Sequence, residues 1–86
     1  AKAWERVRLT PDTLTVERGA PGRPTRIWNF QPYWLRVEAD DKHLTIASHG
    51  KRCELMPFLS AGERRDFAVR LKAALARIKE APTGIP

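Results

Sequence analysis

The sequence predicts an α+β domain in which about six short antiparallel strands form a curled sheet or partial barrel, followed by one amphipathic C-terminal helix. Three observations predict this class. Apolar and polar residues alternate through most of residues 4–56, as they do in half-buried strands. Turn-forming residues interrupt that alternation at short intervals. After residue 60 the apolar residues follow the period of a helix instead.

The first two strands are expected to form a hairpin. Val7 and Leu9 alternate with polar residues, and residues 13–17 repeat the alternation after a turn at Pro11-Asp12. Residues 19–24 contain two Gly and two Pro, a composition that does not sustain strand pairing, so they are expected to form a loop.

The next strands are predicted over residues 25–30, 33–39, 43–48 and 51–56. The segment 33–39 has the clearest alternation. One of its faces would hold Tyr33, Leu35, Val37 and Ala39. The pair His49-Gly50 is predicted to be a two-residue hairpin turn, since Gly readily adopts the positive φ that such turns require.

A helix is predicted over about residues 61–80. Ser60 and Glu63 match a capping box, in which each side chain binds the backbone N–H of the other residue. The apolar stripe of this helix consists of Phe67, Leu71, Ala74, Leu75 and Ile78. A second, basic face holds Arg65, Lys72 and Lys79.

These elements give one β-rich domain over residues 4–80, with a linker at 1–3 and a flexible tail at 81–86. The apolar stripe of the helix would cover an apolar face of the sheet that the strands leave exposed. A sheet that curls into a partial barrel with the helix across one end would be pleckstrin-homology-like. A flat sheet with the helix packed on one face is the alternative.

The charge is basic, with 16 Lys and Arg against 10 Asp and Glu, a formal net charge of +6. Such a domain is biased toward nucleic acid, an anionic membrane surface or an acidic protein. The charges are spread along the chain, so the alternative is a merely solvated surface. No apolar run approaches the roughly 18 residues of a membrane span.

Little in the sequence points to catalysis. Cys53 is the single cysteine and falls on the inner face of a predicted strand, where a structural thiol is expected. His43 and His49 bring no third ligand at metal-binding spacing, and no glycine-rich phosphate loop is present. The sequence therefore predicts no catalytic residue, cofactor or metal, and no enzyme.

Aromatic and basic residues lie close together on two predicted neighbouring strands. If these strands pair, Arg26, Trp28, Trp34 and Arg36 would form an exposed platform. Such a platform suits single-stranded nucleic acid or a membrane interface. The alternative is that the Trp rings fill the core, because small barrels need large side chains inside.

Two blocks of sequence resemble a known family. Residues 30–37 read Phe-Gln-Pro-Tyr-Trp-Leu-Arg-Val, and residues 48–55 read Ser-His-Gly-Lys-Arg-Cys-Glu-Leu. With Phe58-Leu59 and Glu63-Arg64, they are similar to the proteobacterial "integral membrane protein" family of unknown function numbered twenty-two forty-four. The resemblance covers most of residues 4–80, with departures at Gln31 and Met56-Pro57.

The resemblance implies a setting rather than an activity. Family members typically carry two transmembrane helices before this portion, so the chain would be the soluble part of an anchored bacterial inner-membrane protein. Lys2, Arg6 and Arg8 would place it on the cytoplasmic face by the positive-inside rule. A lone thiol fits a reducing compartment. The resemblance carries over no residue with an established role.

The leading hypothesis is a non-enzymatic, membrane-proximal interaction domain that docks a protein partner or anionic headgroups. A nucleic-acid-binding module is the less favoured alternative, and a thiol or histidine enzyme is a third. The candidate interaction surface comprises Arg6, Arg8, Arg26, Trp28, Trp34, Arg36, His49, Gly50, Arg65, Lys72 and Lys79.

Overall fold

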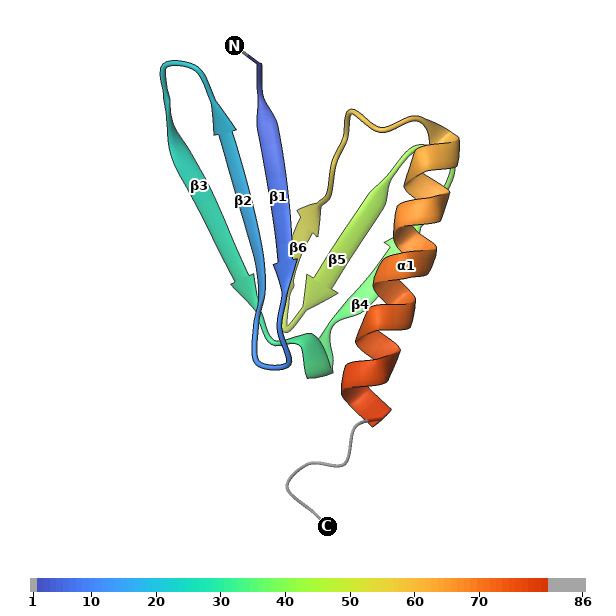
Figure 1. The fold of residues 1–86 in the computed structure, drawn as a ribbon. Coiled ribbons are helices and arrows are strands. Elements are labelled where there is room, and N and C mark those ends of the chain that lie inside the picture. Colours follow the sequence, from blue (N-terminus) through green and yellow to red (C-terminus); the bar gives the residue numbers. More distant parts are fainter. Residues whose placement is uncertain (1, 81–86) are drawn as a thin grey trace. The chain divides into compact units, whose positions relative to one another are not determined.

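A computed structural model describes residues 2–80 of the chain (Figure 1). It contains, in order, β1 (Trp4–Leu9), β2 (Leu14–Ala20), β3 (Arg23–Phe30), a 3₁₀ turn η1 (Pro32–Trp34), β4 (Arg36–Ala39), β5 (Leu44–Ser48), β6 (Lys51–Glu54) and α1 (Ala61–Glu80). The predicted α+β class, the antiparallel strands and the C-terminal helix are confirmed. The predicted tail at 81–86 lies outside the described residues.

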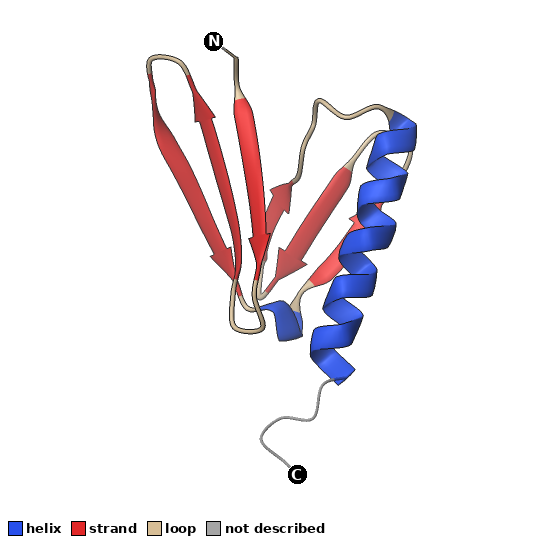
Figure 2. Ribbon diagram, viewed as in Figure 1, coloured by secondary structure: helices blue, strands red, loops and turns tan. Residues whose placement is uncertain are grey.

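The strands form two separate sheets, ordered β1-β2-β3 and β4-β5-β6 (Figure 2). The prediction of one curled sheet or partial barrel was therefore wrong in its pairing, since β3 and β4 are not neighbours in either sheet. The chain divides into two compact units, residues 1–32 and 33–86, with one sheet in each.

The first unit is an antiparallel meander with a regular register. Leu14 lies opposite Phe30 and Val16 opposite Trp28, so these residues share one face of the sheet. Leu14, Val16 and Phe30 are buried, as the alternation in β2 predicts. The opposite face is exposed and carries alternate residues of β1, beginning with Trp4.

The predicted loop at residues 19–24 was wrong, because β2 and β3 continue to a two-residue connection at Pro21-Gly22. Gly22 has φ 74°, which a tight turn can require and glycine adopts without a Cβ clash. Pro24 is tolerated because β3 is an edge strand, and the register shifts at this point of the hairpin.

The neighbour of Gly19 on β1 explains why a glycine occurs within strand β2. Gly19 lies directly opposite Trp4, and a Cβ built on Gly19 would approach three atoms of the Trp4 indole to 2.5 Å. The indole therefore lies across the backbone of β2, and glycine leaves room for it.

The second unit is built on β5, the central strand of its sheet. Leu44 and Ile46 are fully buried, and Cys53 and Leu55 are buried on the β6 side, as predicted. The predicted turn at His49-Gly50 is confirmed. Both residues have positive φ, 50° and 82°, as in a type I′ hairpin turn.

The prediction of one strand over 33–39 was wrong in its first half. Pro32 begins a 3₁₀ turn that includes Tyr33 and Trp34, and β4 starts only at Arg36. Proline fixes its own φ near the value of such a turn, so the local backbone preference overrides the alternating pattern. Tyr33 is exposed instead of facing inward with Leu35.

The helix α1 has the predicted bounds and lies along β4 (Figure 2). Leu71 and Leu75 of its apolar stripe are buried. The capping box is confirmed, since the Ser60 N–H donates to Glu63 Oε1 at 2.9 Å and the Glu63 N–H donates to Ser60 Oγ at 3.2 Å.

This cap makes the stability of the chain sensitive to acid. The hydrogen bonds from the Ser60 backbone and then its hydroxyl hold the pKa of Glu63 below the ordinary 4.5. A carboxylate with a lowered folded-state pKa stabilises the fold above its ordinary pKa, and this contribution is lost as pH falls through the folded value. Ser60→Ala should therefore raise the Glu63 pKa, as measured by carboxyl NMR titration. It should also lower the free energy of unfolding at neutral pH by about 1 kcal/mol.

Candidate functional site

The predicted platform of two Trp and two Arg residues does not form on one sheet. Arg26 and Trp28 lie on β3 in the first sheet, whereas Trp34 lies in η1 and Arg36 on β4 of the second. The prediction assumed that β3 and β4 pair, and that was wrong because the 3₁₀ turn at Pro32 ends one sheet before the next begins.

Three arginines instead surround a hollow at the β2–β3 hairpin. Arg18 lies directly opposite Arg26 in the register, and Arg23 follows the turn. The hollow has a volume of about 220 Å³. It is lined by Ala3, Arg18, Gly19, Ala20, Arg23, Pro24 and Arg26.

The ring of Trp28 lies beside two of these arginines. The guanidinium carbon of Arg18 is 5.0 Å from the Trp28 ring centroid, and that of Arg26 is 4.9 Å from it. Both distances suit cation–π attraction. Trp28 is half-buried, so its ring holds the two cations in place at the edge of the buried face.

The electrostatics of this cluster favour an anion. Like charges directly opposite each other on paired strands destabilise a sheet. Glu5 on β1 offsets part of this repulsion, with an oxygen 2.8 Å from Arg18 Nη2. Arg23 and Arg26 are exposed beside this pair. Guanidinium groups bind phosphate oxygens in a bidentate way, so the hollow has the donors for a phosphate group.

Arg6 and Arg8 do not belong to this cluster. They alternate with Glu5 along β1 and therefore lie on the other face of the sheet. Arg6 forms an ion pair of 3.4 Å with Glu17, and its guanidinium carbon is 5.8 Å from the Trp4 ring centroid. Arg8 is exposed opposite Thr15.

Trp34 is 54% exposed, so the alternative in which the Trp rings fill the core is wrong for this residue. Its ring contacts Tyr33 edge-on at 4.9 Å between centroids and His49 at 6.0 Å. His49 and Gly50 form the neighbouring turn. The buried side chains of the chain are chiefly Leu, Ile and Val, which pack without a polar group to satisfy.

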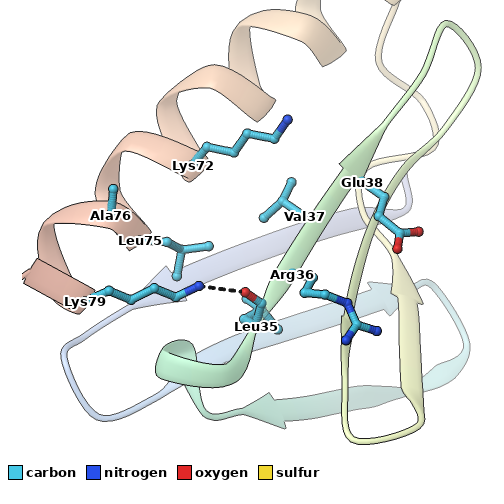
Figure 3. Close-up of a pocket in the computed structure, with 8 residues that line it drawn as sticks. All are labelled: Leu35, Arg36, Val37, Glu38, Lys72, Leu75, Ala76 and Lys79. Carbon is cyan, nitrogen blue, oxygen red and sulfur yellow. Dashed lines mark hydrogen bonds between the residues drawn. The ribbon is translucent and has the colours of Figure 1, made fainter.

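The basic face of α1 is divided between two places. Arg65 lies 4.0 Å from a carboxylate oxygen of Asp41. Lys72 and Lys79 line a groove of about 470 Å³ between α1 and β4 (Figure 3). The other lining residues are Leu35, Arg36, Val37, Glu38, Leu75 and Ala76.

The sequence reasoning missed the arginine that α1 buries. Arg64 is only 6% exposed, and its guanidinium donates to the carbonyls of Asp41 and Leu59, both at 2.7 Å. The signal available was the Glu63-Arg64 pair of the resemblance, which marks the helix start without saying that this arginine is buried. Sequence reasoning also missed Arg18 and Arg23, because only the register brings them to Arg26.

Cys53 and His43 differ in their surroundings. Cys53 is buried on β6, and His43 Nδ1 lies 3.0 Å from Glu54 Oε2 at the surface. Within residues 2–80, no three His, Cys, Asp or Glu side chains are grouped as metal ligands would be.

The fold and these surfaces define a small α+β protein with an arginine-lined hollow in one unit and a lysine-lined groove in the other. The profile of the family described as "Integral membrane protein (DUF2244)" matches residues 1–75. The chain belongs to this family, and the resemblance of its two sequence blocks is confirmed. Neither the curated proteins nor the solved structures include a significant match.

Within residues 2–80, no helix is both long enough and apolar enough to span a membrane.

Proposed function

We propose that this chain is a non-enzymatic, membrane-proximal domain of a bacterial inner-membrane protein, on its cytoplasmic face, and that it docks onto anionic lipid headgroups. The observation that carries the proposal is the group of Arg18, Arg23 and Arg26 around one hollow. Membership of an integral membrane protein family supports a lipid source for the anion.

A bound headgroup phosphate would relieve the repulsion between Arg18 and Arg26, which face each other across the hairpin. The exposed guanidinium groups of Arg23 and Arg26 present N–H donors at the rim of the hollow and leave it open to a large ligand. Trp28 beside them has the amphipathic ring that favours a membrane interface.

The test is binding of the 86-residue chain to vesicles of phosphatidylcholine with or without phosphatidylglycerol. Arg23→Gln/Arg26→Gln should weaken binding to the anionic vesicles about 30-fold, because each well-placed charge near an anionic surface contributes about 1 kcal/mol. Arg70→Gln/Arg77→Gln on α1 removes the same charge from residues outside the hollow and should have an effect below about threefold. Co-sedimentation at physiological salt measures both.

Equal losses in the two double variants would mean that net charge alone drives the binding, and the proposal would be wrong. Single-stranded DNA serves as a second ligand. If Arg23→Gln/Arg26→Gln weakens DNA binding while vesicle binding is unchanged, the nucleic-acid alternative replaces the membrane one.

A further inference from the structure

The strand β4 is an edge of its sheet, with backbone groups that point away from β5. The Asp40 N–H donates to the His43 carbonyl at 2.9 Å, so the backbone of Asp40 faces His43, and the Leu44 carbonyl opposite Ala39 instead accepts from the Leu55 N–H on the β6 side. Hydrogen-bonded pairs recur at every second residue of an antiparallel ladder, so Glu38 and Arg36 face β5 in the same way. The N–H and C=O groups of Val37 and Ala39 therefore point outward.

The outward carbonyl two residues before Val37 accepts a hydrogen bond from a lysine. Lys79 Nζ donates to the Leu35 carbonyl at 3.0 Å across the groove (Figure 3). This contact shows that the groove lies along the outward edge of β4. It also shows that a lysine side chain of α1 is long enough to reach the backbone at that edge.

The groove has an apolar floor and cationic sides. Val37 and Ala76 supply the accessible apolar surface, above the buried Leu35 and Leu75, and Lys72 and Lys79 supply the charge. Figure 3 shows Val37 on the α1 side of β4, whereas Arg36 and Glu38 point away from α1. The Glu38 carboxylate lies 2.8 Å from Arg52 Nη2, so it does not offset the lysines of the groove.

We propose that an extended, acidic segment of a partner protein adds to β4 as a fourth strand, between β4 and α1. Main-chain hydrogen bonds to Val37 and Ala39 would hold the segment, as in other cases of strand addition. Its acidic side chains would pair with Lys72 and Lys79. This site goes beyond the proposed headgroup binding and uses none of the arginines of the hollow.

Lys79 has two roles in this proposal. In the unbound chain its ammonium group satisfies the Leu35 carbonyl. An arriving strand brings an N–H group that takes over this carbonyl, and the ammonium is then released to a carboxylate of the same strand. The charge of the groove thus selects an acidic segment, and the backbone of β4 requires that it be extended.

The probe is an acetylated and amidated octapeptide of alternating Glu and Val, and its Kd for the 86-residue chain is measured by isothermal titration calorimetry. A matching peptide of alternating Lys and Val should bind at least tenfold more weakly because of the lysines. Successive N–H groups of a strand point to opposite edges. Two N-methylated peptides use this property, one methylated at the backbone amides of all Glu residues and the other at those of all Val residues. The peptide whose methylated amides face β4 should lose binding, and the other should keep it.

Amide exchange locates the strand. The peptide should slow exchange at Val37 and Ala39, whose N–H groups gain partners, and leave Arg36 and Glu38 unchanged. Equal effects of the two methylated peptides, or no change at Val37 and Ala39, would overturn the proposal.

Protein variants separate this site from the headgroup site. Lys72→Glu/Lys79→Glu should weaken the Glu-Val peptide at least tenfold, whereas Arg70→Glu/Arg77→Glu, with the same spacing on α1, should change its Kd less than threefold. Arg23→Gln/Arg26→Gln should bind the peptide normally even if vesicle binding is lost. A dimer of the chain by sedimentation equilibrium, with slow exchange at Val37 before any peptide is added, would mean that a second copy occupies the edge instead.

Discussion

Arg64→Ala is expected to lower the free energy of unfolding by about 2–4 kcal/mol. The guanidinium group of Arg64 donates to the carbonyls of Asp41 and Leu59, both at 2.7 Å, and thereby ties the first turn of α1 to the β4–β5 turn and to the segment before the helix. Hydrogen bonds from a charged donor contribute about 1.5–3 kcal/mol each, and the substitution leaves two carbonyls without their donor. Urea denaturation followed by circular dichroism measures the change.

Arg65→Ala is the matched control, one residue further along the same helix. The Arg65 side chain is 67% exposed and only 4.0 Å from the Asp41 carboxylate, so its loss should change stability by less than about 0.5 kcal/mol. Similar values for the two variants would show that the buried arginine contributes nothing beyond its helix propensity. Arg64→Lys should recover only part of the loss. The lysine keeps a charged donor, but its ammonium group cannot reach both carbonyls with the geometry of a guanidinium fork.

Ile46→Ala is expected to cost about 2–5 kcal/mol, a large part of the total stability of a chain of this size. Ile46 lies on the central strand of the second sheet and is fully buried, with Val37 and Cys53 as its neighbours in the register. Removing its outer carbons loses apolar burial and leaves a cavity that the two paired strands cannot close. A drop in the urea midpoint with an unchanged m-value is the expected signature.

Ile27→Ala tests the same chemical change at the surface. Ile27 also lies in a strand, but its residue surface is 56% exposed on the edge strand β3. Only strand propensity and partial burial are lost, so the cost should stay below about 1 kcal/mol. A cost at Ile27 as large as that at Ile46 would contradict the assignment of the core.

The elements that local chemistry determines were predictable from the sequence. The Ser60–Glu63 capping box fixes the start of α1, and the His49-Gly50 pair fixes a hairpin turn, because in both cases a few adjacent residues supply all the required groups. The alternation of Leu14 with Val16 and of Leu44 with Ile46 identified the buried faces of their strands.

The predictions for two segments were wrong because one local preference opposed another. Pro32 began a 3₁₀ turn where Tyr33 and Trp34 continued a strand-like alternation. Pro24 was expected to exclude a strand, but an edge strand leaves the missing N–H without consequence. Neither outcome follows from alternation, because both depend on which strand lies at an edge and where a sheet ends.

The binding surfaces were harder to predict than the elements. Arg26, Lys72 and Lys79 were identified, yet their partners Arg18 and Leu35 come from strand register and helix packing, which join residues far apart in the sequence. Separating Arg6 and Arg8 from Arg26 likewise requires the register, since a shift of one residue exchanges the two faces of a strand.

The contact between Gly19 and the Trp4 indole links two positions that are 15 residues apart in the numbering. A larger residue at position 19 fits only where the residue at position 4 is smaller or turns its ring away, so substitutions at the two positions are expected to be coupled. Substitutions at either one are expected to be rescued by changes at the other. Across the family, the pair should thus change together, and the size of the residue at position 4 sets which residues position 19 accepts.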